Sequence, residues 1–162
     1  MKNRNLNHSD NWATPKDLYD ELNREFNFDF DPCPLNIGEV TPDKDGLLIE
    51  WGKSNFINPP YSKNLKEAFV KRAIKESKNG KLCVMLLPVS TSTKLFHKYV
   101  LPNANEIRFI EGRVRFEGVN TKGVKVDDQP GMHDSMVVVF GSHSPIRAVG
   151  AFKRNSFQYT LL

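Results

Sequence analysis

The four residues Asn58-Pro59-Pro60-Tyr61 constrain this chain more than any other stretch. Two consecutive prolines fit neither a helix interior nor a central strand, and here they follow an apolar run that ends at Ile57. Each proline also favours an extended conformation in the residue before it. We therefore expect a strand that ends at Ile57, followed by an extended segment whose side-chain and backbone oxygens are free to accept hydrogen bonds.

The polar groups of this segment suit one kind of chemistry. The side-chain oxygen of Asn58 and the carbonyl of Pro59 can both accept hydrogen bonds from a single amino group. A ring-conjugated NH₂ is a poor nucleophile, and two such acceptors raise the electron density on its nitrogen. Tyr61 offers a flat face on which a planar group stacks. The motif indicates a site for methylating a conjugated amine, and the structural alternative is a rigid proline turn after a strand.

Length and charge narrow the class of protein. The chain has 162 residues and a formal charge of +4, which suggests one domain and permits a nucleic-acid partner without requiring one. We expect a disordered segment at 1–11 and one domain at 12–162. The sequence contains no apolar run of roughly 18 residues and no signal-peptide core, so we expect no membrane segment. The two cysteines, Cys33 and Cys83, form no Cys-x-x-Cys pair, which fits a reduced cytoplasmic protein without a zinc site.

The first helix is predicted to run from Pro15 to Glu25. Thr14 is suited to the N-cap, Pro15 to the first helical position and Asp17 to the capping box. Trp12 precedes this start and is placed to pack over it. On residue type alone this is a well-capped amphipathic helix.

Two aspartates are candidates for a cofactor site. A short strand with alternating phenylalanines ends at Asp31-Pro32, and ligands of open α/β sheets bind at the carboxyl ends of strands. A carboxylate there can bond a ribose hydroxyl or an ammonium group, although Asp before Pro also starts turns. Asp29 lies inside the strand and is less suited. Asp45-Gly46 is a turn signal.

The remaining elements are read from apolar patterning. A helix follows Tyr61 and ends at Asn79-Gly80. Its Lys71, Lys75 and Lys78 form either a solvated face or a phosphate-binding stripe. Buried strands are expected at 81–88, 106–112 and 135–141, an alternating strand at 113–118, and a helix at 94–101 ended by Pro102. Residues 118–134 are predicted to be a loop and 142–162 a weakly patterned tail. Strands without an intervening helix suggest an antiparallel pair at one sheet edge.

The ordered set of motifs resembles the small phage-type DNA N6-adenine methyltransferases. The matching segments are Trp12-x-Thr14-Pro15, Phe30-Asp31-Pro32, Asp45-Gly46-Leu47, Asn58-Pro59-Pro60-Tyr61, Leu86-Leu87-Pro88 and Gly112-Arg113-Val114-Arg115-Phe116. The resemblance implies a compact Rossmann-like α/β fold of the S-adenosylmethionine (SAM)-dependent methyltransferases, with a mostly parallel sheet that ends in an antiparallel hairpin. It implies SAM as methyl donor and a flipped adenine of double-stranded DNA as acceptor, with no metal. It also assigns Asn58 to Tyr61 to catalysis, and Trp12, Thr14, Pro15, Asp31, Pro32 and Asp45 to the cofactor.

One departure from the general SAM-binding pattern is the missing glycine-rich turn, because no G-x-G precedes Asn58. No separate target-recognition domain is evident, so Arg113 and Arg115 are candidates for phosphate or base-edge contact, or else an exposed strand face. Two other functions stay open: SAM-dependent methylation of RNA or of a protein glutamine amide, and nucleic-acid binding without catalysis. A phage origin is implied by the resemblance alone, and would place the protein in the host cytoplasm. The sequence does not indicate the oligomeric state.

Overall fold

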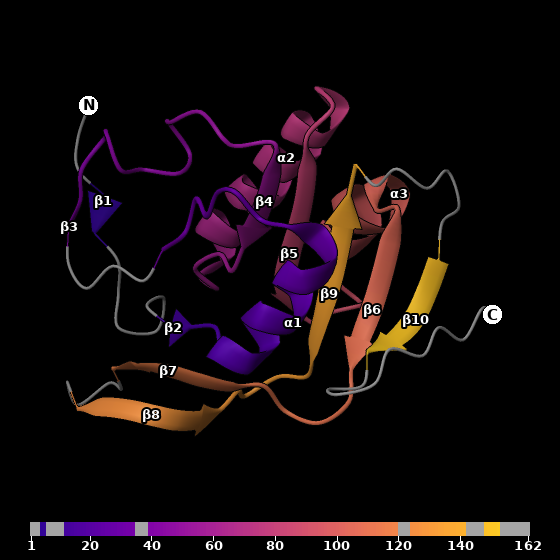
Figure 1. The fold of residues 1–162 in the computed structure, drawn as a ribbon. Helices are drawn as coiled ribbons and strands as arrows, with labels where there is room; N and C mark the ends of the chain where they lie inside the picture. Colours follow the sequence, from indigo (N-terminus) through magenta and orange to yellow (C-terminus); the bar gives the residue numbers. More distant parts are fainter. Residues whose placement is uncertain (1–3, 6–11, 35–38, 120–123, 142–147, 153–162) are drawn as a thin grey trace.

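The apolar run from Leu82 to Pro88 forms strand β5, which lies inside a five-stranded sheet in the computed structural model of the chain (Figure 1). The structure describes residues 4–5, 12–34, 39–119, 124–141 and 148–152. The strand order is β10-β6-β9-β5-β4. The other strands of this sheet are β4 (Ser54–Ile57), β6 (Glu106–Ile110), β9 (Ser135–Phe140) and β10 (Ala148–Phe152).

The predicted mostly parallel, Rossmann-like sheet ending in an antiparallel hairpin is wrong. The main sheet is mixed: β4 pairs parallel with β5 and β10 parallel with β6, whereas β9 runs antiparallel to both of its neighbours. The antiparallel pair β6–β9 exists, but β9 lies between β5 and β6 and not at an edge. Every residue of β9 is buried, and such a strand is stable only with neighbours on both edges and cover on both faces.

Alternate residues of the central strands supply two cores, one on each face of the sheet. Cys83, Met85 and Leu87 pack in the core beneath helix α2 (Lys63–Lys78), and Val84 and Leu86 pack in the core beneath helix α1 (Lys16–Phe26). This alternation is the ordinary period of a strand. The main sheet is therefore a middle layer between α1 and α2 (Figure 1).

Two small antiparallel sheets complete the described fold. One pairs β1 (Arg4–Asn5) with β3 (Glu39–Val40), and the other has the order β2-β7-β8, with bounds Trp12–Ala13, Arg115–Val119 and Lys125–Pro130. Strand β1 falls within the segment predicted to be disordered, whose other residues lie outside the described part of the chain. In Figure 1 the strands β6 and β10 point towards the end of the molecule that holds β7 and β8. The carboxyl ends of the parallel strands thus face the β2-β7-β8 sheet.

Several element boundaries differ from the sequence prediction. The loop expected at 118–134 contains strand β8, which pairs with β7, and β10 forms within the expected tail. The chain after residue 94 forms a π-helical turn, η2 (Phe96–Val100), and Pro102 does not end it but lies inside the short helix α3 (Leu101–Asn103). Val100 and Leu101 both have right-handed helical backbone angles, so the helical path continues through Pro102 and ends before the extended Ala104. No helix among the described residues is long and apolar enough to cross a membrane.

Candidate active site

The Asn58-Pro59-Pro60-Tyr61 motif lies directly after β4, where the sequence predicts it. The Asn58 side chain donates a hydrogen bond from Nδ2 to the backbone oxygen of Trp12, at 2.9 Å. A carbonyl cannot donate, so this contact fixes which branch of the amide is nitrogen. The opposite branch, Oδ1, is an acceptor that no donor from the described residues occupies. Both prolines are buried, so the position of this acceptor is set by a rigid segment.

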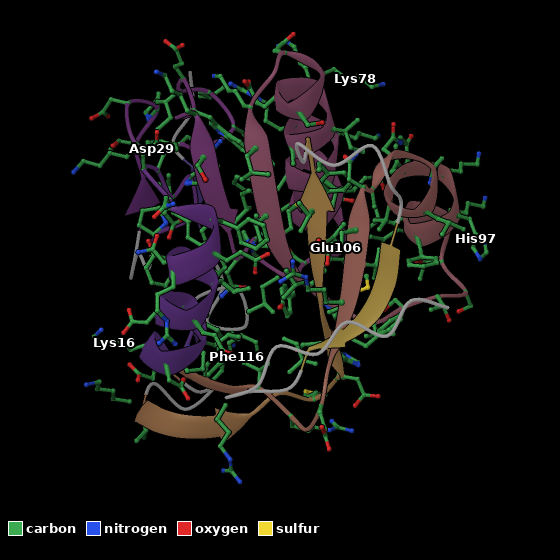
Figure 2. The ribbon with its side chains drawn as sticks, turned by 45° about the vertical axis from the view of Figure 1, so that its right-hand side comes forward. Lys16, Asp29, Lys78, His97, Glu106 and Phe116 are labelled. Carbon is green, nitrogen blue, oxygen red and sulfur yellow. The ribbon has the colours of Figure 1, made fainter. Side chains whose placement is uncertain are left out.

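Tyr61 is fixed at two points. Its hydroxyl lies 3.4 Å from the backbone oxygen of Leu86, and its ring meets that of Phe116 edge to face at 6.2 Å between centroids. Figure 2 shows Phe116, a residue of β7, below α1. Burial raises the pKa of Tyr61 above its usual range, so the hydroxyl stays neutral. The ring is therefore held in one orientation beside Asn58, and stacking of a planar group on it stays a prediction.

The start of α1 brings Trp12, Thr14 and Pro15 to the same place. Thr14 was expected to cap the helix, but the N-cap is Pro15 and it makes no side-chain capping hydrogen bond. The Asp17 carboxylate instead accepts from the N–H of Leu18, so the predicted capping box is absent. The Thr14 hydroxyl is buried and has no hydrogen-bond partner among the residues that the structure describes. A buried unsatisfied hydroxyl costs about 1–3 kcal/mol, which marks this atom as one that a ligand can satisfy.

Asp31 stands at the same end of the sheet. Phe30 forms a parallel bridge with Asn55 of β4, so Asp31 follows the bridge in the direction of Asn58. Burial raises the pKa of Asp31 to about 6, although a hydrogen bond from the Cys33 N–H partly opposes that rise. A carboxylate that is costly to ionise in the free protein is suited to a cationic partner.

Asp29, the aspartate that lies two residues earlier, is structural. Its carboxylate accepts hydrogen bonds from the N–H groups of Lys53 and Ser54 at 3.2 and 3.0 Å. It therefore holds the start of β4 and takes no part in the site.

The segment of Asp45 and Gly46 packs against Asp31-Pro32. A Cβ on Gly46 would lie 2.0 Å from the backbone oxygen of Pro32, so only glycine allows this approach. The Asp45 carboxylate accepts from the N–H of Leu47 at 2.9 Å, as in an Asx turn. The structure thus shows Asp45 in its turn role, and a contact with a cofactor stays a prediction.

Arg72 of α2 holds this segment in place from the other side. Its guanidinium donates to the backbone oxygens of Leu47 and Ile49 and pairs with Glu76 at 2.7 Å. Lys81 also pairs with Glu76 at 2.9 Å and donates to the Trp51 backbone oxygen. A buried ionic network therefore fixes the loop that touches Pro32.

Tyr19 belongs to the site although the sequence analysis did not select it. It lies one helical turn after Pro15, and its ring packs edge to face on Phe56 at 5.2 Å. Its pKa is raised by burial and by the nearby charge of Asp31. The available signal was the spacing of four residues from Pro15, which sets both on one helix face.

The four residues proposed for DNA contact divide into two groups. Arg113 and Arg115 are exposed next to and on β7, the strand that supplies Phe116 to the site. Lys71 and Lys75 lie roughly 12 and 18 Å along α2 from its first residue, at a rise of about 1.5 Å per residue. Figure 2 shows Lys78, further along the same helix, far from Phe116. Lys71 also pairs with Glu67 at 2.6 Å and covers the Tyr99 ring.

Comparison with known proteins assigns the chain to a family. The profile of the DNA N-6-adenine-methyltransferase (Dam) family matches residues 2–159. The DNA N-6-adenine-methyltransferase of Haemophilus phage HP1 is 36% identical over 146 residues, which cover 84% of this chain and 81% of that protein. The enzyme of the same description from Escherichia phage T1 is 32% identical over 110 residues, 63% of this chain but 45% of that protein. No solved structure gave a significant match. The chain belongs to the DNA N-6-adenine-methyltransferase family, which confirms the resemblance.

Proposed function

We propose that the protein transfers a methyl group from SAM to N6 of a flipped adenine in double-stranded DNA. The observation that carries this proposal is the hydrogen bond from Asn58 Nδ2 to the Trp12 oxygen, which leaves Oδ1 as a fixed acceptor beside the Tyr61 ring. The family and the phage relatives support the acceptor. A base must leave the stack for such chemistry. We place the protein in the cytoplasm, that of the host cell if a phage encodes it.

The residues near α1 fit the donor. SAM carries a sulfonium and an ammonium cation together with ribose hydroxyls, and supplies an electrophilic methyl group when bound. The ionised Asp31 carboxylate would hold an ammonium or a ribose hydroxyl, and the unsatisfied Thr14 hydroxyl would bond a polar group of the same molecule. Trp12, Pro15, Pro32 and Asp45 would form the walls around them.

Catalysis then rests on position and polarisation. The adenine stacks on Tyr61, and its amino group donates to Asn58 Oδ1 and to the Pro59 carbonyl. SAM, when bound, would supply the methyl group to the N6 lone pair and would leave as a neutral thioether that keeps the electron pair of the broken S–C bond. The methylated nitrogen then loses one proton to water. No nucleophilic side chain is needed, and the described residues contain no group of three His, Cys, Asp or Glu arranged to hold a metal.

Transfer of a tritiated methyl group from SAM, followed by nucleoside mass spectrometry of the DNA, tests this function. Purified protein and SAM are incubated with adenine-unmethylated plasmid DNA, with RNA and with a protein lysate. We expect N6-methyladenine in the digested DNA and no transfer to the other two acceptors. Methylation of RNA or protein alone would move the assignment to another acceptor, and absence of both transfer and SAM binding would reject the enzyme.

A further inference from the structure

A hollow of about 420 Å³ lies beside the catalytic motif, on the face of the sheet that α2 covers. Its walls come from the first turn of α2, the end of β5 and the segment that follows β5. β4 runs parallel to β5, so the residues that follow Ile57 and the last residue of β5, Pro88, lie at the same end of the sheet. Pro88 lines the hollow. The hollow therefore lies at the same end of the sheet as Asn58.

The charge of this hollow is positive. Three lysines line it: Lys63 and Lys66 from α2, and Lys94 from the segment after β5. Glu67 is the acid among its lining residues, and its carboxylate is already paired with Lys71 at 2.6 Å. We call these three lysines and the space between them the lysine hollow.

The floor of the lysine hollow is apolar, with Leu87, Phe96 and Met136, and Ser90 adds a hydroxyl at its rim. A few polar groups over an apolar floor are typical of ligand sites, and the volume lies within their usual range of roughly 300–1,000 Å³. The cationic lining excludes a metal ion and indicates an anionic ligand.

Among the three lysines of the hollow, Lys66 is the one whose partly buried charge no contact of the described residues compensates. Its side chain is partly buried, and burial lowers the pKa of its ammonium group. Among the described residues it has no ion pair and no side-chain hydrogen bond. Removing an ammonium from water is costly unless a partner compensates for the lost hydration. Such a group is retained where an outside anion supplies the missing partner.

We infer that the lysine hollow binds the phosphodiester backbone of the substrate DNA next to the target adenine. The inference rests on the proposed function, which makes DNA the acceptor. SAM is an unsuitable occupant because its sulfonium and ammonium cations would face three lysines. The cations of SAM fit better near Asp31. The charge of Asp31 raises the pKa of Tyr19 on α1, the helix that covers the face of the sheet opposite to α2. The α1 side of this end of the sheet thus presents a carboxylate for SAM, and the α2 side presents three lysines for DNA.

The test is the salt dependence of DNA binding, measured by fluorescence anisotropy on a plasmid fragment that the wild-type protein methylates. The variant carries Lys66→Met, which keeps the apolar stem, together with Lys94→Ala. Each lost phosphate contact reduces the slope of log K against log salt by about 0.9. We expect the slope of the double variant to fall by about 2, with SAM affinity unchanged. Lys66→Met alone should raise the melting temperature, since it removes a poorly solvated charge.

The control is Lys78→Ala, an exposed lysine at the far end of α2 (Figure 2). It should leave the slope unchanged. The inference is overturned if the double variant keeps the wild-type slope, or if Lys78→Ala lowers the slope as much as the double variant does. In either case, methylation of the fragment by the wild-type protein would still support the proposed function. If the wild-type protein neither methylates nor binds DNA, the proposed function fails first and the inference fails with it.

Discussion

Replacing Asp31 by asparagine should strengthen the fold and weaken the cofactor site at once. Burial raises the pKa of this carboxyl from 3.8 to about 6. A rise of that size corresponds to at most about 3 kcal/mol of unfavourable ionisation in the folded state. The side chain keeps partial contact with solvent, so we expect about 1–2 kcal/mol. Because the folded-state pKa is the higher one, the contribution of Asp31 to stability is full below about pH 4 and is lost as pH rises through 6.

The substitution is close to isosteric. An asparagine oxygen can still accept from the Cys33 N–H, as the Asp31 carboxylate does at 2.7 Å. Urea denaturation at pH 8 should therefore show Asp31→Asn about 1–2 kcal/mol more stable than wild type, with the difference gone near pH 4. Titration calorimetry should show that Asp31→Asn weakens the binding of SAM. With a pKa of about 6, only about one molecule in ten carries the Asp31 charge at pH 5, so wild-type affinity should fall about tenfold from pH 7.5 to 5, and the variant should bind weakly without this pH dependence.

Asp29→Asn is the matched control. The Asp29 carboxylate accepts from two backbone N–H groups, and an asparagine has only one acceptor oxygen to offer them. This variant should lose about 1–2 kcal/mol of stability and keep the pH dependence of SAM binding. The reasoning is refuted if Asp31→Asn is less stable than wild type at pH 8, or if it binds SAM with the wild-type affinity and pH profile.

Three further substitutions test the cofactor side of the site. Thr14→Val removes a buried hydroxyl that bonds no group in the described part of the chain, so the melting temperature should hold or rise while SAM affinity falls severalfold; a loss of stability would show that the hydroxyl has a structural partner. Gly46→Ala places a Cβ 2.0 Å from the Pro32 oxygen and should cost about 1–3 kcal/mol in urea denaturation, whereas a neutral effect would mean that the loop moves freely. Arg72→Ala leaves the buried Glu76 without one of its partners and should cost about 3 kcal/mol or more; a cost below 1 kcal/mol would contradict the role of this network in fixing the loop.

The position of the Asn58–Tyr61 segment after β4 could be predicted from sequence because its constraints are local. Proline geometry alone ends β4 at Ile57 and exposes the acceptors that follow it. The helix after Tyr61 and the buried strand at Leu82–Pro88 also follow from apolar period and length. These features depend on residues that are neighbours in the chain.

The strand order could not be predicted in the same way, because it depends on pairing between distant segments. The apolar pattern of Ser135–Phe140 shows that the strand is buried, but the same pattern suits any central position. Strand β8 (Lys125–Pro130) is polar and rich in turn-forming residues, so its sequence predicts a loop. Its strand conformation depends on pairing with β7. Thr14 was a reasonable cap by residue type, but α1 starts one residue later, with Pro15 as its N-cap.

The most direct test of the proposed mechanism is single-turnover methyl transfer by Asn58→Ala, with SAM binding measured on the same preparation. If Asn58 Oδ1 accepts from the adenine amino group, the rate should fall by on the order of a hundredfold or more, while SAM affinity stays within about twofold of wild type. Asn64→Ala, at an exposed position in the first turn of α2, should transfer at the wild-type rate. Transfer by Asn58→Ala at that same rate would contradict the proposed mechanism.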